Sequence, residues 1–387
     1  MTARPSRPAH LMRALFVYHP YYPDTCRLET MPFALNVLNA LIDEGFQMDL
    51  MLWQDADGLP QRVIERAHIH SFTMNRYHRA LGLDGAEFAA LKLGCIGKFS
   101  FIAAVGAMGL VRTAGFLRGA AGSLSLYLND EFPSYVPRDK WSARHLAAAR
   151  RVAAIAVPDE IRAGQLRREL ELEESTPIFE LPNCPAHLDV SGRDFRAELG
   201  LPAHARFFLF SGALADHMQF PEILSSVPSW PADHVLVING RTQEETAAAR
   251  RTFSHLDLPG RVYWTQGGLS EPDLHRLIRD ATGAFALYRN SGPNLELVGL
   301  SSGKLSRSIA LGTPVIASRL GSLAFVEAAG IGVCVRHPVE IAEALRQIEC
   351  ERASMSECCR RVAAEHLDFS RQWTLLRSRM PSLAATA

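Results

Sequence analysis

Short apolar runs alternate with amphipathic stretches along most of the chain. Residues 13–18 and 46–53 are apolar runs, and residues 33–44 between them carry apolar side chains at helical spacing. A strand, a helix and a second strand in this order are how a doubly wound α/β sheet begins. The same pattern predicts further strands at 124–128, 152–157, 178–185, 206–211, 235–239, 262–265, 284–288, 315–317 and 333–335.

The stretches between many of these strands have helical spacing. The length of the chain suggests that these elements form more than one domain. Residues 55–97 show helical pieces and no firm strand. A chain of 387 residues is longer than a single hydrophobic core usually supports, so two domains are expected. The sequence thus predicts an α/β protein of two Rossmann-like domains facing across a cleft, residues 1–185 and 186–365, with a C-terminal helix in 366–387 that packs back toward the first domain. The other helices are expected at 141–149, 159–170, 195–201 and 273–281.

The composition describes an ordinary soluble globular protein. Hydrophobic residues make up 48% of the chain, and 41 basic residues balance 41 acidic ones. Because no net charge attracts nucleic acid, we expect no nucleic-acid partner. The seven cysteines are odd in number and no two form a CxxC pair, which favours neither a disulfide framework nor a zinc site. With no cleavable signal sequence at the N-terminus, we expect a cytoplasmic location.

One apolar segment bears on the question of membrane contact. Residues 99–110, FSFIAAVGAMGL, are nearly all apolar and lie between Lys98 and Arg112. The segment is too short and too rich in Gly and Ala for a membrane span. We expect a buried domain helix. The alternative is a helix at the inner face of a membrane, with Lys98, Arg112 and Arg118 meeting lipid headgroups.

The most informative stretch is 299–318, GLSSGKLSRSIALGTPVIAS. It predicts a small-residue turn, a helix, a Gly-Thr-Pro break and a buried strand. Hydroxyls, backbone N–H groups and Lys304 gather at the helix start, where partial positive charge suits a phosphate. The alternative is an ordinary αβ loop with a solvated lysine. A Walker A loop matches poorly, because Gly299 precedes Gly303 by too few residues and Leu305 follows the lysine.

Neither half of the chain carries the glycine fingerprint of dinucleotide-binding folds. No GxGxxG follows the first strand of either half. The sequence therefore argues against a dinucleotide cofactor and favours a nucleotide bound in another way.

The order of elements resembles the GT-B glycosyltransferases of the group that includes families 1 and 4. The motifs that carry the resemblance are FFLFSGAL, VLVINGR, VYWTQGGLSEPDLHRLIRDATGAFALY, SSGKLSRSIALGTPVIAS and GIGVCV, which lie in this order within 206–348, where the match is strongest. The SSGKL loop and the strand at 124–128 also resemble those of bacterial exopolysaccharide enzymes such as xanthan glucuronosyltransferase.

The resemblance implies that the C-terminal half binds a nucleotide-sugar donor and the N-terminal half a saccharide or lipid-linked acceptor. It implies no bound metal and no cofactor besides the donor. Lys304 would stabilise the charge that grows on the leaving diphosphate. The implied donor-binding residues are Gly212, Gly267, Gly268, Tyr288, Ser302, Gly303 and Lys304, although Tyr288 can equally be a core aromatic.

The chain departs from the family at one motif. Many family 4 enzymes place a pair of glutamates at fixed spacing before the glycine of Gly-Thr-Pro. The corresponding positions here are Gly299 and Arg307, and Glu296 is out of register. A retaining mechanism therefore cannot be inferred from this motif.

The resemblance and the strand ends together indicate a general base. A carboxylate or histidine must take the proton of the acceptor hydroxyl. Asp130, directly after the strand 124–128, is the first candidate, and the alternative is that it caps the following turn. Glu131 and His19 are the other candidates for the base or for acceptor contact.

The function expected from this resemblance is sugar transfer from a nucleotide-diphosphate-sugar to a hydroxyl group, in surface polysaccharide or glycolipid assembly. Two alternatives stay open. One is a nucleotide-sugar epimerase of the same fold. The other is a catalytically inactive GT-B chain that serves as a partner subunit.

Overall fold

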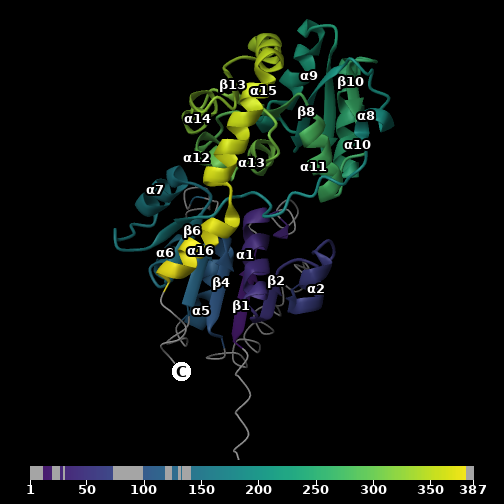
Figure 1. Cartoon of the computed structure of the whole chain (residues 1–387). Helices are drawn as coiled ribbons and strands as arrows, with labels where there is room; N and C mark the ends of the chain where they lie inside the picture. Colours follow the sequence, from purple (N-terminus) through teal and green to yellow (C-terminus); the bar gives the residue numbers. More distant parts are fainter. Residues whose placement is uncertain are drawn as a thin grey trace, which may run out of the picture. The chain divides into compact units, whose positions relative to one another are not determined.

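The computed structural model describes residues 12–19, 27–28, 31–72, 99–117, 124–129, 132 and 141–380. The chain forms two compact units, residues 1–181 with 371–387 and residues 182–370. Each unit is built on one parallel sheet with helices packed on it (Figure 1). The predicted α/β class with two Rossmann-like domains is confirmed.

The first unit has seven parallel strands in the order β3-β2-β1-β4-β5-β6-β7 among the described residues. The first strand of the chain thus lies beside the fourth, which places the topological switch point between β1 and β4. The strands are β1 (Arg13–Tyr18), β2 (Gln47–Leu52), β3 (Ala67–Ser71), β4 (Phe101–Val105), β5 (Leu124–Leu128), β6 (Ala154–Val157) and β7 (Ile178–Glu180). The helices are α1 (Pro32–Asp43), α2 (Gln61–Arg66), α5 (Gly106–Leu117), α6 (Trp141–Ala149), α7 (Glu160–Glu169) and α16 (Phe369–Arg379).

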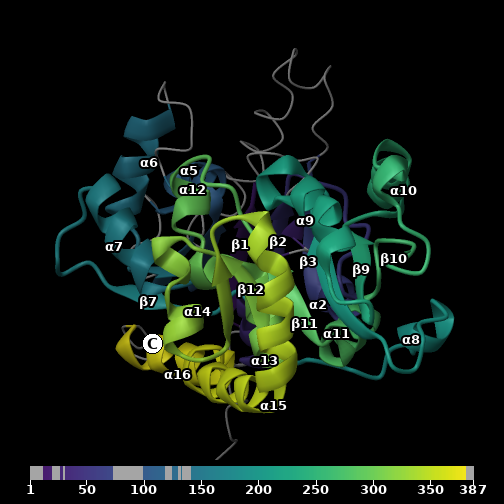
Figure 2. The same cartoon turned by 90° about the horizontal axis from the view of Figure 1, so that it is seen from above.

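The second unit repeats this winding with six parallel strands in the order β10-β9-β8-β11-β12-β13. The strands are β8 (Arg206–Gly212), β9 (His234–Gly240), β10 (Val262–Trp264), β11 (Gly283–Ala286), β12 (Val315–Ser318) and β13 (Gly332–Val335). The helices are α8 (Phe195–Glu198), α9 (Phe220–Ser226), α10 (Gln243–Thr252), α11 (Glu271–Asp280), α12 (Pro293–Glu296), α13 (Gly303–Ala310), α14 (Phe325–Ala328) and α15 (Ile341–His366). Within this unit α13 packs against α15 (Figure 2).

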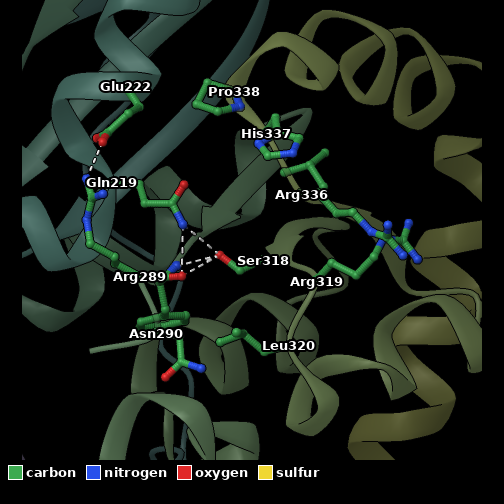
Figure 3. Close-up of a pocket in the computed structure, with 12 residues that line it drawn as sticks. Gln219, Glu222, Arg289, Asn290, Ser318, Arg319, Leu320, Arg336, His337 and Pro338 are labelled. Atoms are coloured by element: carbon green, nitrogen blue, oxygen red, sulfur yellow. Dashed lines mark hydrogen bonds and ion pairs between the residues drawn. The ribbon is translucent and has the colours of Figure 1, made fainter. Parts of the chain in front are cut away.

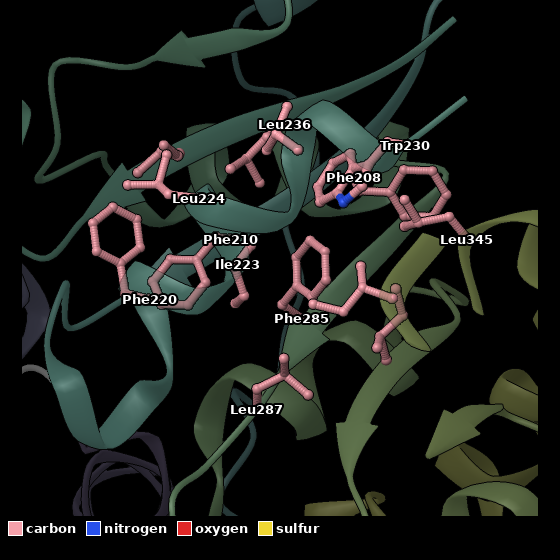
Figure 4. Close-up of a cluster of buried hydrophobic side chains, with 14 of the residues drawn as sticks. Phe208, Phe210, Phe220, Ile223, Leu224, Trp230, Leu236, Phe285, Leu287 and Leu345 are labelled. Atoms are coloured by element: carbon pink, nitrogen blue, oxygen red, sulfur yellow. The ribbon is translucent and has the colours of Figure 1, made fainter. Parts of the chain in front are cut away.

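Strand β8 explains why the predicted apolar runs form buried parallel strands. Its side chains alternate between two cores, because successive residues of a strand point to opposite faces. Phe208 and Phe210 join one cluster, whereas Phe207 and Leu209 join the cluster on the other face. A strand covered on both faces is apolar at every position rather than at every second one. The first cluster also contains Phe220, Ile223, Leu224, Trp230, Leu236, Phe285, Leu287 and Leu345 (Figure 4).

The segment 99–110 was expected to form one buried helix, and this expectation is wrong. Phe101–Val105 is the strand β4, which pairs with β1 on one side and β5 on the other. Gly106, with φ at +69°, ends the strand and begins α5. Close packing of α5 on β1 explains Gly109, because a Cβ at this position would lie 2.9 Å from the Val17 carbonyl oxygen. An apolar strand followed at once by an apolar helix has the composition of a single long helix.

One strand of the first unit was not expected from the sequence, whereas a C-terminal helix that packs back toward this unit was expected. Residues 67–71 form the edge strand β3 inside a region for which no strand was predicted. In α16, the Trp373 indole donates to Glu44 Oε1 at 2.8 Å, and Arg377 Nη2 lies 3.0 Å from Glu44 Oε2. Residues 371–387 therefore belong to the first unit although the second unit precedes them in the chain. No helix in the described part is long and apolar enough to cross a membrane.

The pairing of β12 with β13 predicts a strong effect at Gly332. This residue lies opposite Val315, and an added Cβ would come within 2.0 Å of the Val315 oxygen. Because backbone atoms of a central strand cannot move away easily, Gly332→Ala should lower the free energy of unfolding by about 1 to 3 kcal/mol. Urea unfolding measures the change. Gly321→Ala is the matched control, since a Cβ there meets no atom within 4 Å. Equal stability of the two variants would contradict the prediction.

Candidate functional site

The carboxyl ends of the strands in the second unit carry the predicted donor residues. Gly212 ends β8, Tyr288 follows β11, and Ser302 precedes α13. In doubly wound sheets, ligands bind at this edge near the switch point, which here lies between β8 and β11. The topology therefore brings residues far apart in the sequence to one edge.

Ser302 and Tyr288 fix the start of α13. Ser302 is the N-cap residue, and its Oγ accepts a hydrogen bond from the Leu305 N–H at 3.2 Å. The Tyr288 hydroxyl bonds to the same Oγ. Both residues are buried, and burial raises the pKa of the Tyr288 phenol, so the hydroxyl stays protonated at neutral pH. Tyr288 is thus a core aromatic, as one reading of the sequence expected, and it also holds the helix start in place.

Lys304 is partly buried, and its ammonium lies among aromatic rings and a thioether. The Nζ atom is 4.7 Å from the centre of the Tyr288 ring, 5.0 Å from the centre of the Phe210 ring and 3.5 Å from Met218 Sδ. Within the described ranges, no carboxylate lies at ion-pair distance from it. Burial first, and the charge of Arg241 second, lower the pKa of Lys304 to about 7. The surroundings therefore stabilise the ammonium far less than water does.

Arg241 and His217 complete a basic cluster with Lys304. Arg241 directly follows β9, and His217 lies in the turn after β8. Burial lowers the pKa of His217, and the charges of Arg241 and Lys304 lower it further. The three basic groups come from three segments of the chain, and the charges of Arg241 and Lys304 lower the pKa values of their neighbours. Arg241 and His217 were not expected at this site from the sequence, although each follows a predicted strand.

The positions predicted to border the donor are occupied by glycine for different structural reasons. Gly212 has φ at +119°, a conformation that side chains disfavour, and a Cβ there would meet no atom within 4 Å. Gly267 is packed against α10, where a Cβ would lie 2.0 Å from Thr246 Oγ1. The Gly268 N–H donates to the Gly240 oxygen at 3.1 Å. Close packing explains Gly267 and turn geometry explains Gly268, and their contact with base or ribose stays a prediction.

One of the two positions of the missing glutamates, Arg307, has a structural role. Arg307 Nη2 lies 3.0 Å from Glu271 Oε1 and so connects α13 to α11. Burial raises the pKa of Glu271, but the hydrogen bond from His275 and the charge of Arg307 outweigh it and leave the carboxyl ionised. Glu296 is exposed at the end of α12. An arginine in an ion pair cannot replace the carboxylate of the family motif.

A polar pocket of about 350 Å³ opens at the carboxyl ends of β11, β12 and β13 (Figure 3). Gln219 Nε2 donates to the backbone carbonyl oxygen of Tyr288 at 2.8 Å and lies 3.2 Å from Ser318 Oγ. Arg289 lies against Glu222 at the rim, and the two form an ion pair. Because Tyr288 lines this pocket and also contacts Lys304, the pocket adjoins the basic cluster. The other lining residues are Asn290, Arg319, Leu320, Val335, Arg336, His337 and Pro338.

Of the three candidate bases in the first unit, His19 is among the described residues. Asp130 and Glu131 lie outside the described residues. Asn129 precedes them at the end of β5, and its N–H donates to the Ala156 oxygen at 2.9 Å. His19 follows β1, is 3% exposed, and stacks on the Trp53 indole with 4.6 Å between ring centres. His19 is therefore part of the packed edge of the sheet rather than a solvated loop histidine.

The pKa of Lys304 predicts that its charge destabilises the folded chain. Lys304→Met keeps the apolar contacts and removes the charge, so the melting temperature should rise by roughly 2 to 4 °C for each kcal/mol of relieved desolvation. The folded pKa, about 7, is below the usual 10.5. The gain is therefore largest at or below about pH 7 and shrinks as the pH rises toward about 10, where the lysine of the unfolded chain loses its proton as well. Thermal unfolding at about pH 6 and pH 9 measures it, with Arg346→Met on exposed α15 as the control. A lower melting temperature at pH 6 would contradict this assignment.

The comparisons with known proteins agree with this architecture. Comparison with protein-family models and with curated proteins gives no match. Among solved structures, HepE of Anabaena in complex with UDP matches with a TM-score of 0.71 and 14% identity, over 95% of this chain and 99% of that one. WaaG, a glycosyltransferase involved in lipopolysaccharide biosynthesis, matches with a TM-score of 0.66 and 12% identity, over 95% and 100%.

A third structure represents a different enzyme class. A protein assigned as a UDP-N-acetylglucosamine 2-epimerase from Listeria monocytogenes matches with a TM-score of 0.60 and 14% identity, over 95% of each chain. At such identities a likeness shows the fold alone. The chain therefore has the two-domain α/β architecture of the GT-B glycosyltransferases.

Proposed function

We propose that the chain is a glycosyltransferase that moves a sugar from a nucleotide-diphosphate-sugar to a hydroxyl acceptor. The observation that carries the proposal is the Lys304 ammonium, which lies at a helix start beside Arg241 and has no carboxylate partner in the described part of the chain. A diphosphate supplies the negative charge that such a cluster lacks. The GT-B fold makes a nucleotide sugar the natural source of that diphosphate.

The backbone at the start of α13 adds donors to the cluster. The first N–H groups of a helix have no partner within the helix. Here the Ser302 side chain accepts from Leu305, and no described group accepts from the N–H groups of Gly303 and Lys304. A phosphate at this place would therefore receive backbone hydrogen bonds as well as the charge of the lysine. The polar pocket beside Tyr288 offers space for another part of the donor.

The proposed step is a displacement at the anomeric carbon of the sugar. The oxygen of the acceptor forms a bond to that carbon, the bond from the carbon to the diphosphate oxygen breaks, and the electron pair leaves with the diphosphate. Lys304 and Arg241 stabilise the charge that develops there. The proton of the acceptor hydroxyl passes to a base, for which Asp130 is proposed first and Glu131 or His19 next.

The acceptor is proposed to be a saccharide or lipid-linked hydroxyl in surface polysaccharide or glycolipid assembly. WaaG, which has the same fold, is involved in lipopolysaccharide biosynthesis. Contact with the inner face of a membrane belongs to this proposal only through a lipid-linked acceptor. The apolar segment 99–110 no longer supports such contact, because Phe101–Val105 is buried in the sheet.

An epimerase is the second candidate, because the epimerase from Listeria has the same fold. The two reactions differ in their products. An epimerase converts the nucleotide sugar into its epimer without any acceptor, whereas the transferase requires an acceptor for turnover and then releases free nucleotide diphosphate. Product analysis with a nucleotide sugar, with and without acceptor, separates them. Saturable donor binding with no turnover under either condition would favour an inactive partner subunit.

The proposal predicts pH-dependent binding of nucleoside diphosphates. Lys304→Met should weaken binding by about 10- to 100-fold, because a hydrogen bond to a charged group contributes about 1.5 to 3 kcal/mol. The bound phosphate raises the pKa of Lys304 from its free value of about 7. Affinity should therefore be highest at or below about pH 7 and fall as the pH rises from there toward the higher pKa of the bound state, above which it levels off. Isothermal titration with a panel of nucleoside diphosphates measures both effects.

The control for this prediction is Arg346→Ala, which removes an exposed charge that pairs with Glu343 on α15. Its affinity should equal that of the unchanged chain. A Lys304→Met variant that folds, binds every diphosphate equally well and keeps the same pH profile would rule out the cluster as the phosphate site.

The proposed base predicts a separation of binding from transfer. Asp130→Asn should lower the turnover number by about 10²- to 10⁴-fold, the usual contribution of general base catalysis. The affinity for nucleoside diphosphates should not change, because Asp130 is assigned to the acceptor. Transfer assays and titrations on the same preparation provide the two readouts, with Arg346→Ala as the control. Full activity of Asp130→Asn would move the assignment to Glu131 or His19.

A further inference from the structure

Three side chains with metal-ligand chemistry meet on one face of the sheet in the first unit. Asp49 lies in β2, and His68 and His70 lie in the neighbouring edge strand β3. The two strands are parallel, with Asp49 opposite His68 and Met51 opposite His70. Residues that face each other across a ladder point to the same side, and so do residues two apart in one strand. The register therefore directs all three side chains to one side of the sheet.

The ligand atoms of these residues converge. His70 Nε2 lies 3.4 Å from Asp49 Oδ1, and His68 Nδ1 lies 3.5 Å from the same oxygen. All three atoms lie within 4.8 Å of one another. Zinc bonds of about 2.0 to 2.2 Å at tetrahedral angles separate two ligand atoms by about 3.3 to 3.6 Å. Both measured distances from the carboxylate fall in this interval.

Arg13 fixes the orientation of the carboxylate. Its Nη2 donates to Asp49 Oδ2 at 2.7 Å, and that bond leaves Oδ1 directed toward the two imidazoles. Ligating carboxylates are commonly held by an outer hydrogen bond of this kind. The side chain of Asp49 is 4% exposed, that of His70 16% and that of His68 71%. The cluster is thus anchored in the protein on one side and open to solvent on the other.

A second group of histidine and carboxylates is arranged differently. His234 contacts Asp233 through Nδ1 at 2.9 Å and Glu349 through Nε2 at 3.4 Å. These two nitrogens are on different sides of the ring, and Arg206 also bonds Glu349 at 2.9 Å. The imidazole therefore bridges two carboxylates. In the group around Asp49, by contrast, two imidazoles approach a single oxygen.

We propose that Asp49 Oδ1, His68 Nδ1 and His70 Nε2 bind one Zn²⁺ ion, with the fourth position open to water. Two imidazoles and a carboxylate suit zinc, and three protein ligands with an open position are a common zinc arrangement. The ion would connect the edge strand β3 to β2. The site does not depend on the proposed function, because none of its residues belongs to the donor cluster or to the candidate bases.

Zinc binding to the full-length chain tests the proposal. The protein is stripped with a chelator, dialysed and titrated with zinc sulfate by calorimetry, and cobalt(II) absorption in the visible range reports the coordination. The unchanged chain should bind one equivalent at this site. His68→Ala and His70→Ala should each weaken binding by at least about 10-fold and remove the cobalt bands.

A histidine elsewhere provides the matched control. His255→Ala removes an exposed imidazole in the second unit and should leave the affinity unchanged. Zinc should also raise the melting temperature of the unchanged chain but not that of His68→Ala, because an ion that binds only the folded state stabilises it. His68→Ala is the decisive variant, since Asp49 variants would leave the Arg13 guanidinium unpaired and can fail to fold. Binding that is equally strong in His68→Ala and in the unchanged chain, or absent from both, would overturn the proposal.

Discussion

The second unit is built around an ammonium group that its surroundings do not neutralise. Lys304 is fixed at the start of α13, where the Ser302 cap and the Tyr288 hydroxyl determine the direction of the helix. Aromatic rings exclude water from the amine without providing an opposite charge. A group that is costly to bury alone is a strong anchor for an anion, and this is the physical basis of the proposed phosphate site.

The elements around Lys304 are rigid for reasons unrelated to any ligand. Phe210, which contacts the amine, belongs to a strand buried on both faces, and its neighbours alternate between two cores. Arg307 joins α13 to α11, and Gly267 allows the end of β10 to approach α10 closely. A basic cluster on such supports keeps its geometry before a ligand arrives. In the proposed transfer reaction, little reorganisation would then be needed when negative charge develops on the leaving group.

The apolar runs predicted most of the fold because parallel strands buried on both faces have an unmistakable composition. The predicted strands 13–18 and 124–128 have the observed bounds. The strand Phe101–Val105 was missed because the apolar helix α5 follows it without a polar break. The edge strand Ala67–Ser71 was missed for the opposite reason, since a strand with exposed polar residues such as His68 shows no apolar run.

The candidate site shows a similar division between local and spatial information. Lys304 could be predicted, because its own segment combines a turn, a cap and a helix start. Arg241 and His217 could not be predicted, because their position beside Lys304 depends on which strands are neighbours in the sheet. The convergence of two histidines on Asp49 has the same origin, since it depends on the register between β2 and β3. Sequence patterns report the environment of one segment, and a site made by several segments appears only when the order of the strands is known.

The return of the chain to the first unit has a consequence for its synthesis. Trp373 and Arg377 contact Glu44, so the helix that covers this part of the first unit leaves the ribosome only after the second unit has been translated. Domains generally fold in order as they emerge. Here the first unit must wait, incomplete, while the whole second unit is translated. The surface around Glu44 is exposed during that interval and is a place where a chaperone could act on the nascent chain.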